Sequence, residues 1–164
     1  MNDTHGVKGE PWYGFDLDGT LAQYDGWKGI DHIGMPVYPV ANMMRRMHAR
    51  GMQVKIVTAR VAPRENPETK PNPWWVERLT VEYPDQTPWR MELPTYTALE
   101  FIKDWCWTWL HFVPEITHQK DHLMVWMLDD RTVQIEPNTG LVLGRMPKEL
   151  ADYYLPSTEV LELK

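Results

Sequence analysis

The chain has 164 residues, of which 43% are hydrophobic and 12% aromatic, which is enough for one domain with a sizeable core. Its formal net charge of −6 argues against a large nucleic-acid surface, although a small phosphorylated substrate needs only local positive charge. The single cysteine, Cys106, allows no internal disulfide, and the sequence shows neither a signal peptide nor a run of about 20 apolar residues. We therefore expect a cytoplasmic protein, with no membrane segment and one domain over residues 1–164.

The first predicted strand, residues 11–16, runs into two aspartates. Asp16 and Asp18 are followed directly by Gly19 and Thr20. In open α/β sheets the ligand crevice lies at the carboxyl ends of the strands. One aspartate there can act as a nucleophile and the other as general acid and base, while their repulsion favours a bound cation. A solvated turn is the plainer interpretation, and a calcium loop would need oxygen ligands that the following residues do not supply.

A loop, a helix and a second strand follow in order. Glycines among apolar residues at 21–38 predict a hairpin or flap beside the aspartate loop. A helix is expected from Pro39 to about Gly51, with a buried stripe of Val40, Met43, Met44 and Met47. Residues 52–59 predict the next strand, so this half forms a parallel crossover unit.

The second strand ends at Thr58 and Arg60, where the first strand placed its aspartates. A planar guanidinium suits a bidentate contact with phosphate. The alternative is a threonine at a strand end beside a solvated arginine.

Residues 61–97 are rich in proline and carry Trp74, Trp75 and Trp89. A loop of this length is uncommon unless it is functional, so we interpret it as a small lid with an aromatic wall. Residues 73–83 could form a short helix within it. A satellite core of packed aromatic rings is the alternative.

A second helix is predicted over residues 98–112, because Thr97 and Glu100 have capping-box spacing before an apolar stripe. Cys106 lies in that stripe and is expected to be an inert core thiol.

The last part of the sheet is predicted from two extended segments. Residues 115–118 form a short one, and residues 123–128 form a continuous apolar run, which is typical of a buried parallel strand. The run ends in Asp129 and Asp130, for which a solvated acidic turn is the alternative to a metal site. Residues 133–143 predict a closing hairpin.

The sequence DxDGT at residues 16–20, the strand that ends in Thr58 and the strand that ends in Asp129 and Asp130 resemble motifs of the haloacid dehalogenase (HAD) superfamily of phosphatases. The LDDR form at the last motif is similar to that of deoxyribonucleotidases, and Arg60 matches phage polynucleotide 3′-phosphatases. The resemblance covers roughly residues 11–140. The chain departs most from the family pattern in the lid, which is too short for a full cap domain and resembles that of small-cap members.

A lysine is the third motif of that superfamily, and Lys120 is its match because it falls between the second helix and the last strand. Lys103 is the competing lysine, but it lies within the predicted helix. His118 and His122 flank Lys120 without an obvious third ligand, so a metal pair there is disfavoured.

The resemblance implies an α/β fold: a small doubly wound (Rossmann-like) parallel sheet with helices on both faces, a flap hairpin and a short lid insert. It implies that Asp16 forms an aspartyl-phosphate, that Asp18 is the general acid and base, and that Thr58 and Lys120 hold the phosphoryl oxygens. Mg²⁺ would be bound by Asp16, by the carbonyl of Asp18 and by Asp129 or Asp130.

The implied substrate is a nucleotide or another small phosphomonoester. Arg60, Gly19 and Thr20 would bind its phosphate, and Trp74 and Trp75 would stack on a base. A phosphatase of nucleic-acid 3′ ends and a non-catalytic binding or regulatory protein remain the alternatives.

Overall fold

The computed structural model describes residues 9–71, 76–78, 81, 95–139, 141–144 and 148. It divides the chain into two compact units, residues 1–130 and 131–164, and the first unit carries the sheet. The prediction of one domain over the whole chain remains a prediction.

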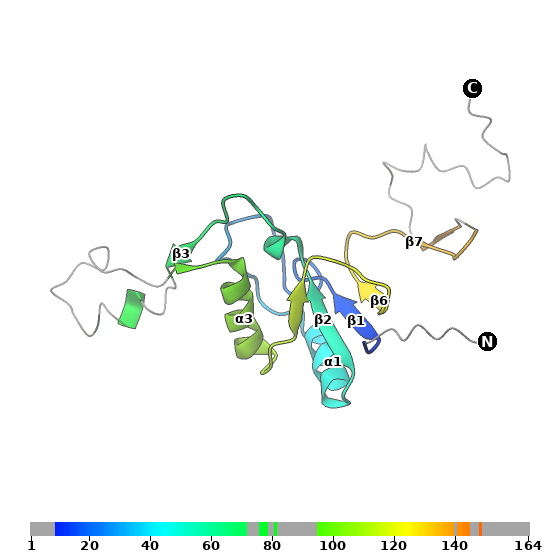
Figure 1. Cartoon of the computed structure of the whole chain (residues 1–164), viewed down its shortest axis with the longest axis horizontal. Helices are drawn as coiled ribbons and strands as arrows, with labels where there is room; N and C mark the ends of the chain where they lie inside the picture. Colours follow the sequence, from blue (N-terminus) through cyan, green and yellow to red (C-terminus); the bar gives the residue numbers. More distant parts are fainter. Residues whose placement is uncertain are drawn as a thin grey trace, which may run out of the picture. The chain divides into compact units, whose positions relative to one another are not determined.

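Four parallel strands form the sheet of the first unit, in the order β5-β2-β1-β6 (Figure 1). They are β1 (Trp12–Phe15), β2 (Gln53–Val57), β5 (Glu115–Thr117) and β6 (Met124–Leu128). The predicted strands are therefore confirmed to within one or two residues at their ends. The chain proceeds from β1 to β2 and β5 on one side and then returns to place β6 on the other side. The strand order thus reverses between β1 and β6, which is where open α/β sheets bind ligands.

Two helices join these strands. The first, α1 (Tyr38–Ala49), lies between β1 and β2, and α3 (Ala98–Trp109) precedes β5. Both were predicted, although α3 ends three residues earlier than expected. The capping box is confirmed, because the side chain of Thr97 accepts from the backbone of the third helical residue and the side chain of Glu100 accepts from the backbone N–H of Thr97.

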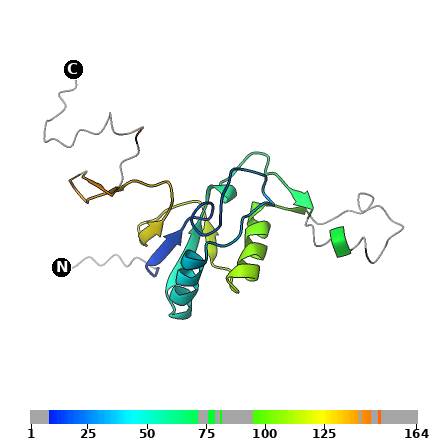
Figure 2. The same ribbon diagram turned by 180° about the vertical axis from the view of Figure 1, so that it is seen from behind.

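Both helices pack on the same face of the sheet, the side toward the viewer in Figure 2. Alternate residues of a strand point to the same face, so Tyr13 and Phe15 of β1 line up beside Val54 and Ile56 of β2. Burying each large side chain fully contributes roughly 1.5–3 kcal/mol. The helices cover these residues with Ala41, Met44, Met47, Ile102, Trp105 and Cys106.

The strand β6 lies at the edge of the sheet and is partly exposed. Its residue Val125 is 53% exposed, and Trp126 is 37% exposed although its ring contacts Tyr13 and Phe15. The predicted full burial of residues 123–128 is therefore wrong. A continuous apolar run does not reveal whether a strand has neighbours on both sides, and within the described ranges no helix covers the face that Val125 occupies.

The flap at residues 21–37 is a closed loop with isolated bridges instead of a regular hairpin. Its ends are joined by hydrogen bonds of 2.8 Å from the backbone N–H of Gln23 to the carbonyl of Met35 and from that of Val37 to the carbonyl of Leu21. Another of 2.8 Å, from the indole of Trp105 to the carbonyl of Gly34, ties the flap to α3. The flap is therefore anchored at its base and on its helix side.

The lid is closed at its base by a short ribbon. After the 3-10 helix η1 (Ala59–Val61), β3 (Lys70–Pro71) pairs antiparallel with β4 (Thr95–Tyr96). Trp74, Trp75 and Trp89 lie outside the described residues, so their predicted roles remain predictions, as does most of the helix proposed at 73–83.

The second unit contains the predicted hairpin, formed by antiparallel β7 (Gln134–Ile135) and β8 (Val142–Leu143). Across the ranges that the structure describes, no helix is long and apolar enough to cross a membrane.

Candidate functional site

Three carboxylates meet at the carboxyl ends of β1 and β6. Asp16 follows β1, and Asp129 and Asp130 follow β6; each offers an oxygen within 4.8 Å of the others. A hydrogen bond of 2.8 Å from the backbone N–H of Asp16 to the carbonyl of Leu128 extends the pairing of the two strands to this point. The cluster therefore lies where the strand order reverses, and the structure brings together residues more than 100 positions apart.

Asp16 is half-buried within this cluster, and its pKa is raised to about 6. Burial is the largest cause, and the negative charges of Asp129, Asp130 and Asp18 add to it, against a hydrogen bond from the backbone N–H of Leu17. Crowded carboxylates of this kind are relieved by a cation.

Gly19 and Thr20 hold the acidic cluster together. Gly19 has a φ of +88°, and a Cβ there would lie 2.8 Å from Cγ of Asp130. The buried hydroxyl of Thr20 accepts a hydrogen bond of 3.1 Å from the backbone N–H of Asp130. Both positions were predicted to bind substrate; in the structure they connect the loop after β1 to the loop after β6.

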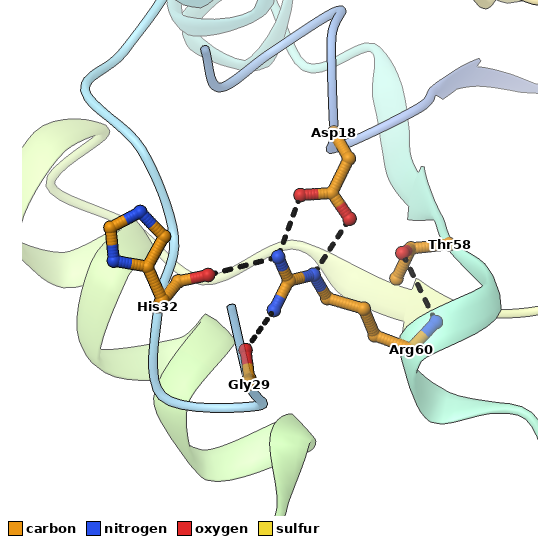
Figure 3. Close-up of polar contacts among 5 residues, drawn as sticks. All are labelled: Asp18, Gly29, His32, Thr58 and Arg60. Atoms are coloured by element: carbon orange, nitrogen blue, oxygen red, sulfur yellow. Dashed lines mark hydrogen bonds and ion pairs between the residues drawn. The ribbon is translucent and has the colours of Figure 1, made fainter. Parts of the chain in front are cut away.

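Asp18 is not one of the three clustered carboxylates; its side chain pairs with Arg60 (Figure 3). Nε of Arg60 donates to Oδ2 of Asp18 at 2.7 Å, and Nη2 donates to Oδ1 at 2.8 Å. The guanidinium is almost fully buried, with 4% of the side chain exposed. A bidentate pair of this kind fixes the direction of the carboxylate as well as its position.

The rest of the Arg60 guanidinium binds the flap. Nη2 donates to the carbonyl of His32 at 2.9 Å and Nη1 to the carbonyl of Gly29 at 3.3 Å. The ring of Trp27, itself 49% exposed, covers the guanidinium at 4.8 Å. Among the residues that the structure describes, four of the five N–H groups are thus engaged, which leaves one for the phosphate contact predicted for Arg60.

Thr58 directly follows β2 and is buried. Its hydroxyl oxygen caps η1 by accepting from the backbone N–H of Arg60 at 3.3 Å, and its own backbone N–H donates to the carbonyl of Thr117 at 2.8 Å. A hydroxyl that accepts still has one proton to donate, so Thr58 can bind an oxyanion while it caps the turn.

Lys120 lies in the exposed link between β5 and β6. In the part of the chain that the structure describes, it forms no hydrogen bond or ion pair with the aspartates. The expectation that it neutralises charge at the site remains a prediction. Cys106 is buried as expected, and burial raises the pKa of its thiol to about 12.

The donor set suits a hard divalent cation. Asp16, Asp129 and Asp130 offer only oxygen, which is the ligand type of Mg²⁺, and Mg²⁺ keeps several waters when few protein oxygens are available. The carboxylate of Asp18 is occupied by Arg60, so that residue could contribute only its main-chain carbonyl.

Sequence reasoning missed Trp27 and the carbonyls of Gly29 and His32. Main-chain carbonyls leave no signature in a sequence. The one available signal was the glycine at position 29. Its φ of +116° lies in the left-handed region, which favours glycine.

No family model, no curated protein and no solved structure matches this chain in the three comparisons.

Proposed function

We propose that this chain is a magnesium-dependent phosphohydrolase that acts on small phosphomonoesters through an aspartyl-phosphate. The supporting observation is the acidic cluster of Asp16, Asp129 and Asp130 at the point where the strand order reverses, with Thr58 at the end of the adjacent strand. The resemblance of its motifs to the HAD superfamily agrees with this chemistry. The four-stranded parallel order is compatible with a Rossmann-like fold. The expected helices on both faces are not found among the described residues, where α1 and α3 share one face. The lone cysteine is compatible with a cytoplasmic location.

In the first step a carboxylate oxygen of Asp16 attacks phosphorus, and the bond from phosphorus to the ester oxygen breaks. Asp18 donates its proton to the departing oxygen, so the product leaves as an alcohol. Because Arg60 holds both oxygens of Asp18, taking up that proton requires one of the two hydrogen bonds to weaken.

In the second step Asp18 accepts a proton from water as the water oxygen attacks phosphorus. The bond between phosphorus and the Asp16 oxygen breaks, which releases inorganic phosphate and restores the carboxylate. Asp18 must therefore serve the same point twice, first as acid and then as base, and its bidentate pair with Arg60 would limit the orientations of its carboxylate through both steps.

Positioning and charge neutralisation dominate phosphoryl transfer. Bound Mg²⁺ would supply positive charge beside the phosphoryl oxygens. The hydroxyl of Thr58 would donate to one of those oxygens, and Lys120 would add a second positive charge from the link before β6.

The test is hydrolysis of acetyl phosphate and p-nitrophenyl phosphate with Mg²⁺ and with excess EDTA. We expect turnover that requires the metal. We also expect turnover to be lost in Asp16→Asn, whose side chain is nearly isosteric, while circular dichroism shows an intact fold. Full activity in a folded Asp16→Asn protein would refute the mechanism.

A further inference from the structure

A pocket of about 310 Å³ opens beside Arg60, and we term it the Arg60 pocket. Three segments form its walls: the flap, the turn at η1 with the residues after it, and the first turn of α3. Its apolar lining includes Ile30, Val61, Pro63, Pro67, Ala98 and Leu99.

The Arg60 pocket has the composition of a site for a small organic group. Such sites are mostly apolar, with a few polar groups that set orientation. Here the polar groups include Arg64 and Glu68, which are both exposed and lie among the lining residues. A guanidinium and a carboxylate can hydrogen-bond to the edge of a base, while flat proline and aliphatic surfaces suit its faces.

One residue, Arg60, contacts both the pocket and Asp18, the candidate general acid. Arg60 lines the pocket and binds both oxygens of Asp18. Ile30 lines the pocket and directly follows Gly29, whose carbonyl also accepts from Arg60. A general acid acts at the oxygen of the leaving group, so the part of the substrate beyond that oxygen lies on the Asp18 side of the site.

We propose that the Arg60 pocket binds the nucleoside of a mononucleotide substrate. This inference rests on the proposed function, because it takes the leaving group to be the part of the substrate that Asp18 protonates. The volume lies at the lower end of the range for ligand sites, roughly 300–1,000 Å³, which suits a nucleoside better than a polymer.

Filling the pocket tests the proposal. Ala62 lines it and is partly exposed, so Ala62→Phe places a ring in the space without burying a charge. Ala49→Phe is the matched control, because Ala49 is exposed at the end of α1, which leads into the amino end of β2, and it does not line the pocket. Leu99→Ala widens the pocket and is the second variant if Ala62→Phe does not fold.

Binding of the four common nucleoside 5′-monophosphates is measured by calorimetry in an Asp16→Asn background, where no turnover occurs. We expect at least one to bind, with a Kd at least tenfold weaker in Ala62→Phe than in Ala49→Phe and weakened in Leu99→Ala. In the active protein, the ratio of kcat/KM for that nucleotide to kcat/KM for acetyl phosphate should fall tenfold or more in Ala62→Phe.

Absence of nucleotide binding, or equal binding in Ala62→Phe and Ala49→Phe, would overturn the assignment of the pocket. Turnover of acetyl phosphate by the unsubstituted chain reports on the proposed function separately. A chain that binds nucleotides in this pocket but hydrolyses nothing would refute the proposed function alone.

Discussion

Arg60 and Asp18 are 42 positions apart in the chain and form a bidentate ion pair, with Nε–Oδ2 at 2.7 Å and Nη2–Oδ1 at 2.8 Å. The same guanidinium binds two carbonyls of the flap. The direction of the Asp18 carboxylate therefore depends on a side chain from η1, the turn after β2, and on the position of the flap.

Replacing Arg60 by lysine should impair proton donation more than phosphate binding. A lysine keeps the charge but not the planar fork, so Asp18 loses its fixed direction. For alkyl phosphates, which need a proton on the leaving oxygen, we expect kcat/KM to fall about tenfold to a hundredfold in Arg60→Lys. For 2,4-dinitrophenyl phosphate, whose leaving group needs no proton, the fall should be much smaller. Arg45→Lys, on the exposed side of α1, is the control. Equal losses on both substrates would instead indicate a direct phosphate contact.

Removing the acidic pair should weaken the metal site. The double variant Asp129→Asn/Asp130→Asn leaves Asp16 as the one carboxylate of the cluster. We expect at least a tenfold higher Mg²⁺ concentration for half-maximal activity, and a matching loss of affinity by calorimetry. The double variant Glu10→Gln/Asp25→Asn removes the same charge from exposed positions and should behave as the unsubstituted chain does. Unchanged Mg²⁺ affinity in the first variant would remove the pair from the site.

The raised pKa of Asp16 predicts a stability change that depends on pH. In the folded, metal-free protein its pKa is about 6, above the usual 3.8 of an unfolded chain. Ionising Asp16 therefore disfavours the folded state above pH 6, and this penalty is relieved as the pH falls through 6 and is gone below 3.8. In EDTA, Asp16→Asn should raise the urea midpoint at pH 8 and leave it unchanged at pH 3.5. The gain in stability will be less than the pKa shift alone implies, because Asp16 is half exposed and water screens its charge. A variant that is no more stable at pH 8 would contradict the raised pKa that burial and the neighbouring carboxylates give Asp16.

Gly19→Ala should destabilise the protein by more than the strain of a left-handed backbone alone. At Gly19 and at Gly51 φ is +88° and +78°, so alanine at either position costs about 1–2 kcal/mol in strain. A Cβ at Gly51 meets nothing within 4 Å, whereas one at Gly19 meets the carboxylate of Asp130. Thermal melts should show a larger loss for Gly19→Ala than for Gly51→Ala, and only Gly19→Ala should weaken Mg²⁺ binding. Equal effects would mean that Asp130 moves aside freely.

The gathering of Asp16, Asp129 and Asp130 could be predicted from sequence, because the ends of parallel strands meet at one edge of a sheet. The helix α3 was equally predictable, since its capping box is local. The pairing of Arg60 with Asp18 was not predictable, because the sequence does not record how closely the loop after β1 approaches the turn after β2. The carbonyls of Gly29 and His32, which also bind Arg60, carry no residue signal. The exposure of Val125 was missed for a related reason: strand order decides which strand lies at an edge, and the composition of a strand does not record it.

The ribbon of β3 and β4 has a consequence for engineering and for divergence. Lys70 pairs with Tyr96 and Pro71 with Thr95, so the two ends of the intervening segment lie side by side. Whatever joins those two points can be shortened to a tight turn or exchanged for a longer segment without moving α3 or the carboxyl ends of the strands. A change in that segment would therefore leave in place both the acidic cluster and the residues that line the Arg60 pocket, all of which lie outside it.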